Sequence, residues 1–69
     1  MERIPITSST VAEVGYDPDT MTLEIAFCNG TVYQYFDVPA MVYQELMSAE
    51  SAGKFLHANI KNNYRYAKM

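Results

Sequence analysis

The sequence predicts a small α+β domain, in which a three-stranded antiparallel β-meander precedes two α-helices packed on one of its faces. Three observations indicate this fold. Residues 21–28 alternate between apolar and polar side chains, as a half-buried strand does. An Asn-Gly pair and a second strand-like run follow directly, which indicates a hairpin. After Pro39 the apolar residues recur at spacings of three and four, which indicates helix.

The length and composition indicate one globular domain over residues 1–69. The chain has 69 residues, of which 49% are hydrophobic and 19% charged, a balance typical of folded and not of disordered chains. A chain this short buries only about 60% of the surface that it exposes when unfolded. Stability must therefore come from the packing of one core, or from packing together with self-association.

The first two strands are predicted over residues 9–16 and 21–28, joined by a turn at Asp17-Pro18-Asp19. In the second strand Leu23, Ile25 and Phe27 share one face. The third strand, TVYQYFDV, begins at Thr31. Together these three strands form the predicted meander.

The Asn29-Gly30 pair predicts a two-residue type I′ turn, and that turn fixes a register. Phe27 would then face Val32, and Leu23 would face Phe36. The predicted core face therefore consists of Leu23, Ile25, Phe27, Val32 and Phe36. Tyr33 and Tyr35 would lie on the opposite face, with Glu24, Ala26 and Cys28. A slip of one residue would exchange the two faces.

Two helices are predicted after the sheet. The first covers residues 39–48, with Pro39 in its first turn and Asp37 serving its start. Its apolar stripe is Val42, Tyr43, Leu46 and Met47. The second covers about residues 52–62, with Ser51 as the N-cap. Phe55, Leu56, Asn59 and Ile60 stand at helical spacing along it. A polar and aromatic tail ends the chain.

Charge is distributed unevenly along the sequence. The formal net charge is −3, which opposes binding to a polyanion unless the bases cluster in space. Residues 1–50 hold one base and all eight acids and sum to −7, whereas residues 51–69 hold four bases and no acid and sum to +4. This asymmetry permits a basic patch on an acidic protein, although the same bases also suit a solvated tail.

Several function classes find no support in the sequence. The single cysteine, Cys28, excludes an internal disulfide, and no Cys/His cluster predicts a metal. Asp17 and Asp19 suit a turn better than a calcium site. No motif around Cys28 or His57 supports a catalytic pair, so we expect neither an enzyme nor a cofactor. No apolar segment approaches the length of a membrane helix, and we expect a cytoplasmic protein.

Two groups of residues are candidates for binding. Tyr33 and Tyr35 could stack on the bases of a nucleic acid, or they could cover a second sheet face beneath a partner subunit. The C-terminal segment mixes bases with aromatic rings, a combination that suits single-stranded RNA or DNA. The candidate binding residues are Tyr33, Tyr35, Lys54, Lys61, Tyr64 and Arg65, with Tyr66 and Lys68 in the same segment.

A set of short motifs resembles the KTSC domain. The motifs are GYD at 15–17, FCNG at 27–30, YQYFDVP at 33–39, A-x-S-x-G at 49–53, and Ile60-Lys61 followed by Tyr64. The resemblance extends from about Ser8 to Tyr64. This short domain is named for its occurrence at the C-terminus of some lysyl-tRNA synthetases, and it also occurs as a stand-alone bacterial or phage protein. Leu56 and His57 stand here where the family usually has Phe-Asn, and Lys61 where Arg is common.

The resemblance implies an RNA-binding role, because RNA binding has been suggested for the family. We therefore expect a small non-catalytic binding module whose partner is single-stranded RNA or tRNA. The alternative is a protein–protein or self-association module that buries the Tyr33/Tyr35 face, together with Ala26 and Cys28, against a protein partner or a second copy. Neither alternative involves a membrane or a metal.

Overall fold

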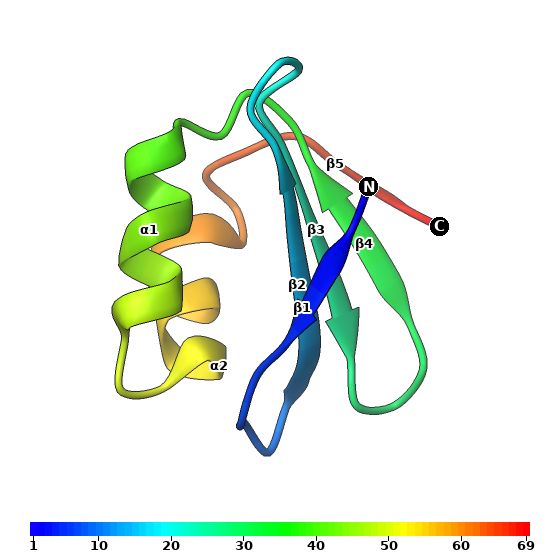
Figure 1. Ribbon diagram of the computed structural model, residues 1–69, viewed down its shortest axis with the longest axis vertical. Coiled ribbons are helices and arrows are strands. Elements are labelled where there is room, and N and C mark those ends of the chain that lie inside the picture. Colours follow the sequence, from blue (N-terminus) through cyan, green and yellow to red (C-terminus); the bar gives the residue numbers. More distant parts are fainter.

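The computed structural model describes residues 1–69 as one antiparallel sheet with its helices on one side (Figure 1). The sheet has five strands in the order β1-β2-β3-β4-β5, so the three-stranded prediction is wrong in strand number, although the α+β class is confirmed. The strands are β1 (Arg3–Pro5), β2 (Val11–Asp17), β3 (Thr22–Phe27), β4 (Val32–Tyr35) and β5 (Tyr66–Lys68). The central meander of β2, β3 and β4 is the predicted one. β1 and β5 add an edge on either side.

The β3–β4 hairpin has a three-residue loop instead of the predicted two-residue turn. The N–H of Phe27 donates to the carbonyl oxygen of Thr31 at 2.8 Å, and Cys28, Asn29 and Gly30 lie between them. Of these three loop residues only Gly30 has a positive φ, 93°, whereas a type I′ turn needs positive φ at both central residues. Asn29 Oδ1 instead accepts hydrogen bonds from the backbone N–H and the hydroxyl of Thr31. The side chain that was expected at a turn centre thus closes the longer loop.

The longer loop shifts the register by one residue and corrects the predicted faces. Leu23 pairs with Tyr35 and Ile25 with Tyr33, so both tyrosines lie on the core face. Val32 pairs with Ala26 and lies on the opposite face. Of the five predicted core residues Leu23 and Ile25 are fully buried and Phe27 packs against the core, whereas Val32 and Phe36 lie outside it. Tyr35 takes a core position in their place.

A β-bulge in β2 brings two valines to the core. The pairing with β3 shifts between Val11 and Glu13, which leaves Ala12 as an extra residue. Val11 and Val14 are three positions apart and would face opposite sides of a regular strand, yet both are fully buried. The bulge therefore extends the apolar face of β2 toward the helices.

The helices are α1 (Ala40–Ser48), α2 (Ala52–Phe55) and the π-helix η1 (Leu56–Ile60), which continues α2. The predicted stripe of α1 is confirmed, since Leu46 is buried and its three companions pack against the core. The Ser51 N-cap is also confirmed, because its Oγ accepts from the N–H of Lys54 at 3.2 Å. None of the helices is long and apolar enough to pass through a bilayer.

The predicted role of Asp37 at the start of α1 is wrong. The N-cap position is Pro39, which makes no side-chain cap. Asp37 has a φ of 60°, and its carboxylate binds the guanidinium of Arg65 at 2.9 Å. The carboxylate therefore ties the β4–α1 connection to the C-terminal segment and is not available to the helix.

Tyr16 links the sheet to α1. Its hydroxyl donates to the carbonyl oxygen of Val38 at 2.6 Å, and its ring stacks on that of Tyr43 with centroids 4.9 Å apart. Burial, and secondarily the charge of Asp17, raises the pKa of Tyr16. The neutral phenol is therefore the form that holds this contact.

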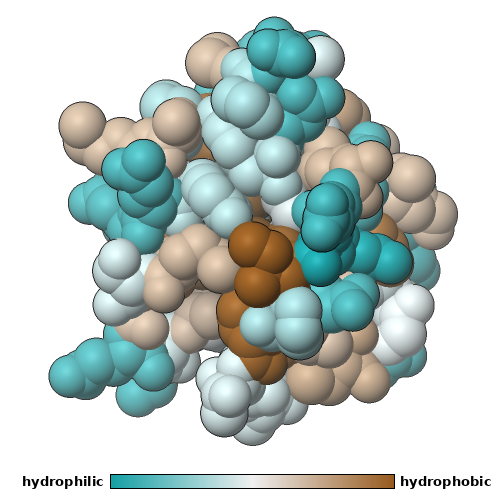
Figure 2. All heavy atoms as spheres, in the orientation of Figure 1, coloured by the Kyte–Doolittle hydropathy of each residue, from teal (hydrophilic) through white to brown (hydrophobic).

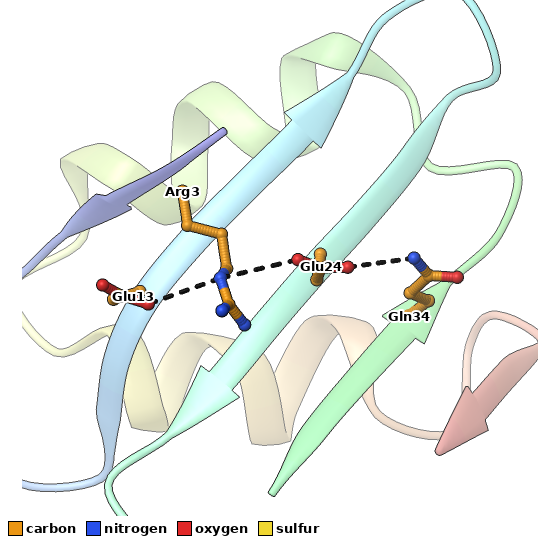
Figure 3. A network of polar contacts seen from close by, with 4 residues as sticks. All are labelled: Arg3, Glu13, Glu24 and Gln34. Atoms are coloured by element: carbon orange, nitrogen blue, oxygen red, sulfur yellow. Dashed lines mark hydrogen bonds and ion pairs between the residues drawn. The ribbon is translucent and has the colours of Figure 1, made fainter. Parts of the chain in front are cut away.

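The face of the sheet turned away from the helices carries a polar network (Figure 3). Arg3 on β1 lies 3.3 Å from the carboxylate of Glu13 and 3.5 Å from that of Glu24. Gln34 on β4 donates to the other carboxylate oxygen of Glu24 at 2.9 Å. Side chains from four strands thus meet around Glu24, which is only 9% exposed. The face of the molecule seen in Figure 2 is mainly hydrophilic or intermediate, with one compact hydrophobic patch near the middle of the view.

Candidate functional site

Three tyrosines gather on the helix-facing side of the sheet at its β4–β5 edge. Tyr33 and Tyr35 come from β4, and Tyr66 is the direct partner of Tyr35 on β5. The ring centroid of Tyr66 lies 5.6 Å from that of Tyr33 and 5.9 Å from that of Tyr35. Phe27 adds an edge-to-face contact with Tyr33 at 5.7 Å. Because successive strand residues face opposite sides, a single register places all four rings together.

The opposite wall comes from η1 and the residues after it. Leu56 is buried at the start of η1, and His57 next to it is exposed. η1 ends at Ile60, and Lys61 follows with an extended backbone. Asn62 then has a φ of 83°, which turns the chain toward β5. The π-helical turn thus places a histidine, a lysine and an amide opposite the tyrosines.

These two walls enclose a cleft of about 330 Å³, which we call the tyrosine cleft. Its sheet wall consists of Phe27, Tyr33, Tyr35 and Tyr66, and its helix wall of Leu56, His57, Lys61 and Asn62. Thr10, Asn29, Thr31 and Gly53 complete the lining. None of the twelve residues has a carboxylate, although the chain as a whole is acidic. A neutral or negatively charged ligand with an aromatic part therefore fits the lining.

The Tyr35 hydroxyl is the most unusual group of the cleft. Tyr35 is only 3% exposed, yet its hydroxyl makes no hydrogen bond within the chain and is not among the fully enclosed polar atoms. Since Tyr35 lines the cleft, we infer that its hydroxyl is reached from there. Burial, followed by the neighbouring Tyr33 and Tyr66, raises the pKa of Tyr35, so the hydroxyl is a neutral donor at physiological pH. A buried side chain thus presents an unpartnered donor to whatever fills the cleft.

The structure brings together only three of the six site residues predicted from the sequence. Tyr33, Tyr35 and Lys61 line the tyrosine cleft together. Lys54 lies outside it, in a second and more open hollow that is lined only by polar residues and glycine.

Tyr64 and Arg65 are not part of either hollow. Tyr64 is half-buried and packs against the core. Arg65 is paired with Asp37 and lies 6.0 Å over the ring of Phe36, with 79% of its side chain exposed. Their position follows from the short chain segment between η1 and β5. Both residues therefore act in holding that segment to the body of the domain.

Sequence reasoning predicted three of the twelve lining residues and missed the other nine, among them Phe27, His57, Asn62 and Tyr66. Phe27 was assigned only to the core, and His57 and Asn62 were given no binding role. Tyr66 was noted in the basic segment but not as a neighbour of Tyr33 and Tyr35. The alternation of Tyr64, Tyr66 and Lys68 was the available signal, because it is the pattern of a strand. Pairing that strand with β4 would have brought the rings together.

The face proposed for self-association does not exist as one surface. Tyr33 and Tyr35 lie on the helix side of the sheet, whereas Ala26 lies on the other side. Cys28 is in the hairpin loop, where its Sγ is 3.7 Å from the carbonyl oxygen of Ser8. Burial of Tyr33 and Tyr35 against a protein partner or a second copy stays a prediction. No group of three acidic, histidine or cysteine side chains is arranged to hold a metal ion.

Comparison with known families gives a match over most of the chain. A sequence model described as the KTSC domain matches residues 7–64, close to the range of the resemblance noted in the sequence. The crystal structure of a KTSC domain protein from Yersinia pestis superposes with a TM-score of 0.93 and 42% sequence identity. The match covers 99% of this chain and 96% of the Yersinia chain.

Curated relatives are of two kinds. An uncharacterized protein of Stutzerimonas stutzeri is 39% identical over 67 residues, which are 96% of this chain and 94% of the relative. A lysine–tRNA ligase of a Nostoc species is 41% identical over 54 residues, which are 78% of this chain but only 10% of the ligase. The same unit thus occurs nearly alone and as a small part of a much longer protein.

Proposed function

This chain belongs to the KTSC domain family, and we propose that it is a non-catalytic module that binds unpaired RNA in the tyrosine cleft. One observation carries the proposal: Tyr33, Tyr35 and Tyr66 line one wall of a cleft of about 330 Å³, with Lys61 on the opposite wall and no carboxylate in the lining. A nucleobase presents a flat apolar face and a polar edge. The cleft offers rings for the face and hydroxyl, amide and imidazole groups for the edge.

The exposed aromatic rings of the cleft favour single-stranded RNA over duplex RNA as the ligand. A base stacked on an aromatic side chain contributes about 1–3 kcal/mol, and such stacking needs a base that has left its own helix. Tyr66 is 58% exposed, which leaves much of its ring free to stack. A rigid duplex would have to be opened before a base could reach these rings.

The charges around the tyrosine cleft favour the binding of a polyanion, although the net charge of the chain, −3, opposes it. All eight carboxylates lie outside the tyrosine cleft and the adjoining hollow, which hold Lys61, Lys54 and His57. Lys68 is the direct partner of Tyr33 across β4 and β5 and shares its side of the sheet. Lys61 and Lys54 therefore line two adjoining hollows, and Lys68 lies on the same side of the sheet as Tyr33. Such grouping can attract phosphate locally on an acidic protein.

The names of several relatives favour RNA over DNA as the proposed ligand. Several proteins that contain this unit are named lysine–tRNA ligases, and the substrate in that name is an RNA. The cleft by itself accepts either nucleic acid, since stacking and phosphate contacts occur with both. A matched DNA oligomer therefore belongs in the first experiment.

The experiment is an amide-shift NMR titration of the full chain with a short mixed-sequence single-stranded RNA at several salt concentrations. We expect saturable shifts at Tyr33, Tyr66 and Lys61, and an affinity that falls as salt rises. Tyr66→Ala should weaken binding about tenfold without changing the salt slope, because it removes a stacking ring. Lys61→Gln should reduce the slope by about 0.7, the value for one phosphate contact on a single strand.

Arg65→Gln is the matched control, since it removes one positive charge from a side chain already paired with Asp37. It should leave affinity and slope nearly unchanged. A folded protein that shows no shifts in the cleft with RNA or DNA would refute the proposal. Sedimentation of the same samples would test the competing prediction of self-association, which requires a mass above the 7.8 kDa monomer.

A further inference from the structure

A polar hollow adjoins the tyrosine cleft and is not used by stacking. It is lined by Ser9, Thr10, Ser51, Gly53, Lys54 and His57. Three of these residues, Thr10, Gly53 and His57, also line the tyrosine cleft, so the two spaces adjoin each other. A ligand in the cleft therefore has a neighbouring space into which a second part of it can extend.

The lining of the polar hollow is made of hydrogen-bond donors. Its lining residues carry three hydroxyl groups, one imidazole and one ammonium, and no carboxylate. The ammonium of Lys54 forms no ion pair within the chain, since Arg3 and Arg65 are the only bases that do. The hydroxyls of Ser9 and Thr10 make no hydrogen bond within the chain either. These groups are free to bind an anion.

Gly53 packs closely against Thr10 at the edge of the hollow. A Cβ at Gly53 would lie 3.2 Å from Cβ and 3.3 Å from Oγ1 of Thr10. A side chain at this position would therefore crowd Thr10, which lines both spaces. Glycine thus lets α2 pack closely against the β1–β2 connection at the border of the two spaces.

We propose that the polar hollow is a phosphate subsite, so that the domain binds one nucleotide with its base in the tyrosine cleft and its phosphate against Lys54, His57 and the hydroxyls of Ser9 and Thr10. This inference rests on the proposed function and specifies the unit that is bound. Charge-assisted hydrogen bonds from an ammonium and neutral ones from hydroxyls are the usual contacts of a bound phosphate. The Tyr35 hydroxyl then donates to the base or the sugar at the cleft end.

The test compares adenosine, adenosine 5′-monophosphate, adenosine 3′-monophosphate and inorganic phosphate as probes of the full chain by amide-shift NMR. We expect adenosine to shift Tyr33 and Tyr66. One of the two monophosphates should shift Thr10, Lys54 and His57 in addition and bind about tenfold more tightly than adenosine. Inorganic phosphate alone should shift only the polar hollow, at higher concentration.

Two variants separate the subsite from the cleft. Lys54→Gln should remove most of the tenfold advantage and leave the affinity for adenosine unchanged, and Ser9→Ala should reduce the same advantage by a smaller factor. Arg65→Gln is the charge-matched control and should keep the full advantage.

The possible failures are distinguishable. Adenosine shifts with no advantage for either monophosphate, or an advantage that Lys54→Gln retains, would overturn the phosphate subsite and leave the proposed function standing. Monophosphates and inorganic phosphate that shift only the polar hollow, with no response of Tyr33 or Tyr66 to adenosine, would overturn base binding and the proposed function with it.

Discussion

Tyr35 and Tyr66 face each other across β4 and β5 with ring centroids 5.9 Å apart, and one ring is 3% exposed while the other is 58% exposed. The inner ring belongs to the core with Leu23 and Ile25, and the outer ring forms the open side of the tyrosine cleft. One cross-strand pair therefore joins the stability of the domain to its candidate site. Substitution of Tyr35 should therefore affect mainly the stability of the domain, and substitution of Tyr66 mainly its RNA binding.

Tyr35→Ala should destabilise the domain by about 3–5 kcal/mol, because it removes a large buried ring from a small core. Tyr66→Ala should cost less than about 1 kcal/mol, since most of that ring is in water, and should act on RNA binding instead. Urea denaturation of both variants measures the difference. Equal losses of stability would contradict the arrangement of the pair. Because Tyr35→Ala is expected to unfold part of the population, it cannot serve as a test of stacking.

Tyr35→Phe should retain the fold and weaken RNA binding, because it removes only the hydroxyl that is reached from the cleft. Because this hydroxyl has no hydrogen-bond partner within the chain, its removal should change the free energy of unfolding by less than about 1 kcal/mol. Affinity should fall several-fold if the ligand accepts a hydrogen bond from this group. Unchanged affinity in the NMR titration would show that the hydroxyl does not contact the ligand.

The domain should lose stability above about pH 10, because the pKa values of Tyr16 and Tyr35 are raised in the folded state, chiefly by burial. Below the pKa of an unfolded tyrosine both states bind the phenolic proton, and this contribution does not vary with pH. Above it the unfolded chain releases protons that the folded chain keeps, so the free energy of unfolding falls as pH rises. Urea denaturation at pH 8, 10 and 11 measures this loss. Tyr35→Phe should show a shallower loss, and an identical one would indicate that Tyr35 does not titrate differently on folding.

The sequence predicted the local elements better than their pairing. The alternation in residues 21–28 and the helical stripe around Leu46 reflect burial of one face, which a pattern of side chains records directly. The register of the β3–β4 hairpin was wrong by one residue, because Asn-Gly suits both a two-residue turn and a loop with Gly30 at positive φ. This shift of one residue places Tyr33 on the core face and Val32 on the opposite face, so the two tyrosines of the Y-x-Y motif lie on the helix side of the sheet.

The candidate site was predicted in part. Lys61 and the tyrosines were identified by residue type, but their meeting depends on β5 and on the π-helical turn of η1. The alternation of Tyr64, Tyr66 and Lys68 was the only signal for the three-residue strand β5, and no side-chain pattern distinguishes a π-helical turn from an α-helical one. The pairing of Arg65 with Asp37 also lay beyond the sequence, because the two residues are 28 positions apart.

Gly30→Ala should destabilise the domain by about 1 kcal/mol. Gly30 has a φ of 93°, a conformation that alanine adopts only with strain, whereas a Cβ at this position would meet no other atom within 4 Å. The cost should therefore come from the backbone alone. Asn29→Ala is a useful companion, because it removes the acceptor for the N–H and hydroxyl of Thr31 without a change of φ. A Gly30→Ala variant as stable as the parent would contradict the positive φ of Gly30 in this loop.

Arg3→Met should destabilise the domain by about 1 kcal/mol, because it leaves the nearly buried carboxylate of Glu24 with only Gln34 as a partner. The figure is modest since the Arg3 side chain is itself about one-third exposed, and solvent screens its charge. Glu24→Gln in the same chain should restore part of the loss, because a neutral amide at this position needs no cation. A double-mutant cycle by urea denaturation measures this coupling. If the two losses simply add, Arg3 stabilises β1 by covering the sheet and not through the charge of Glu24.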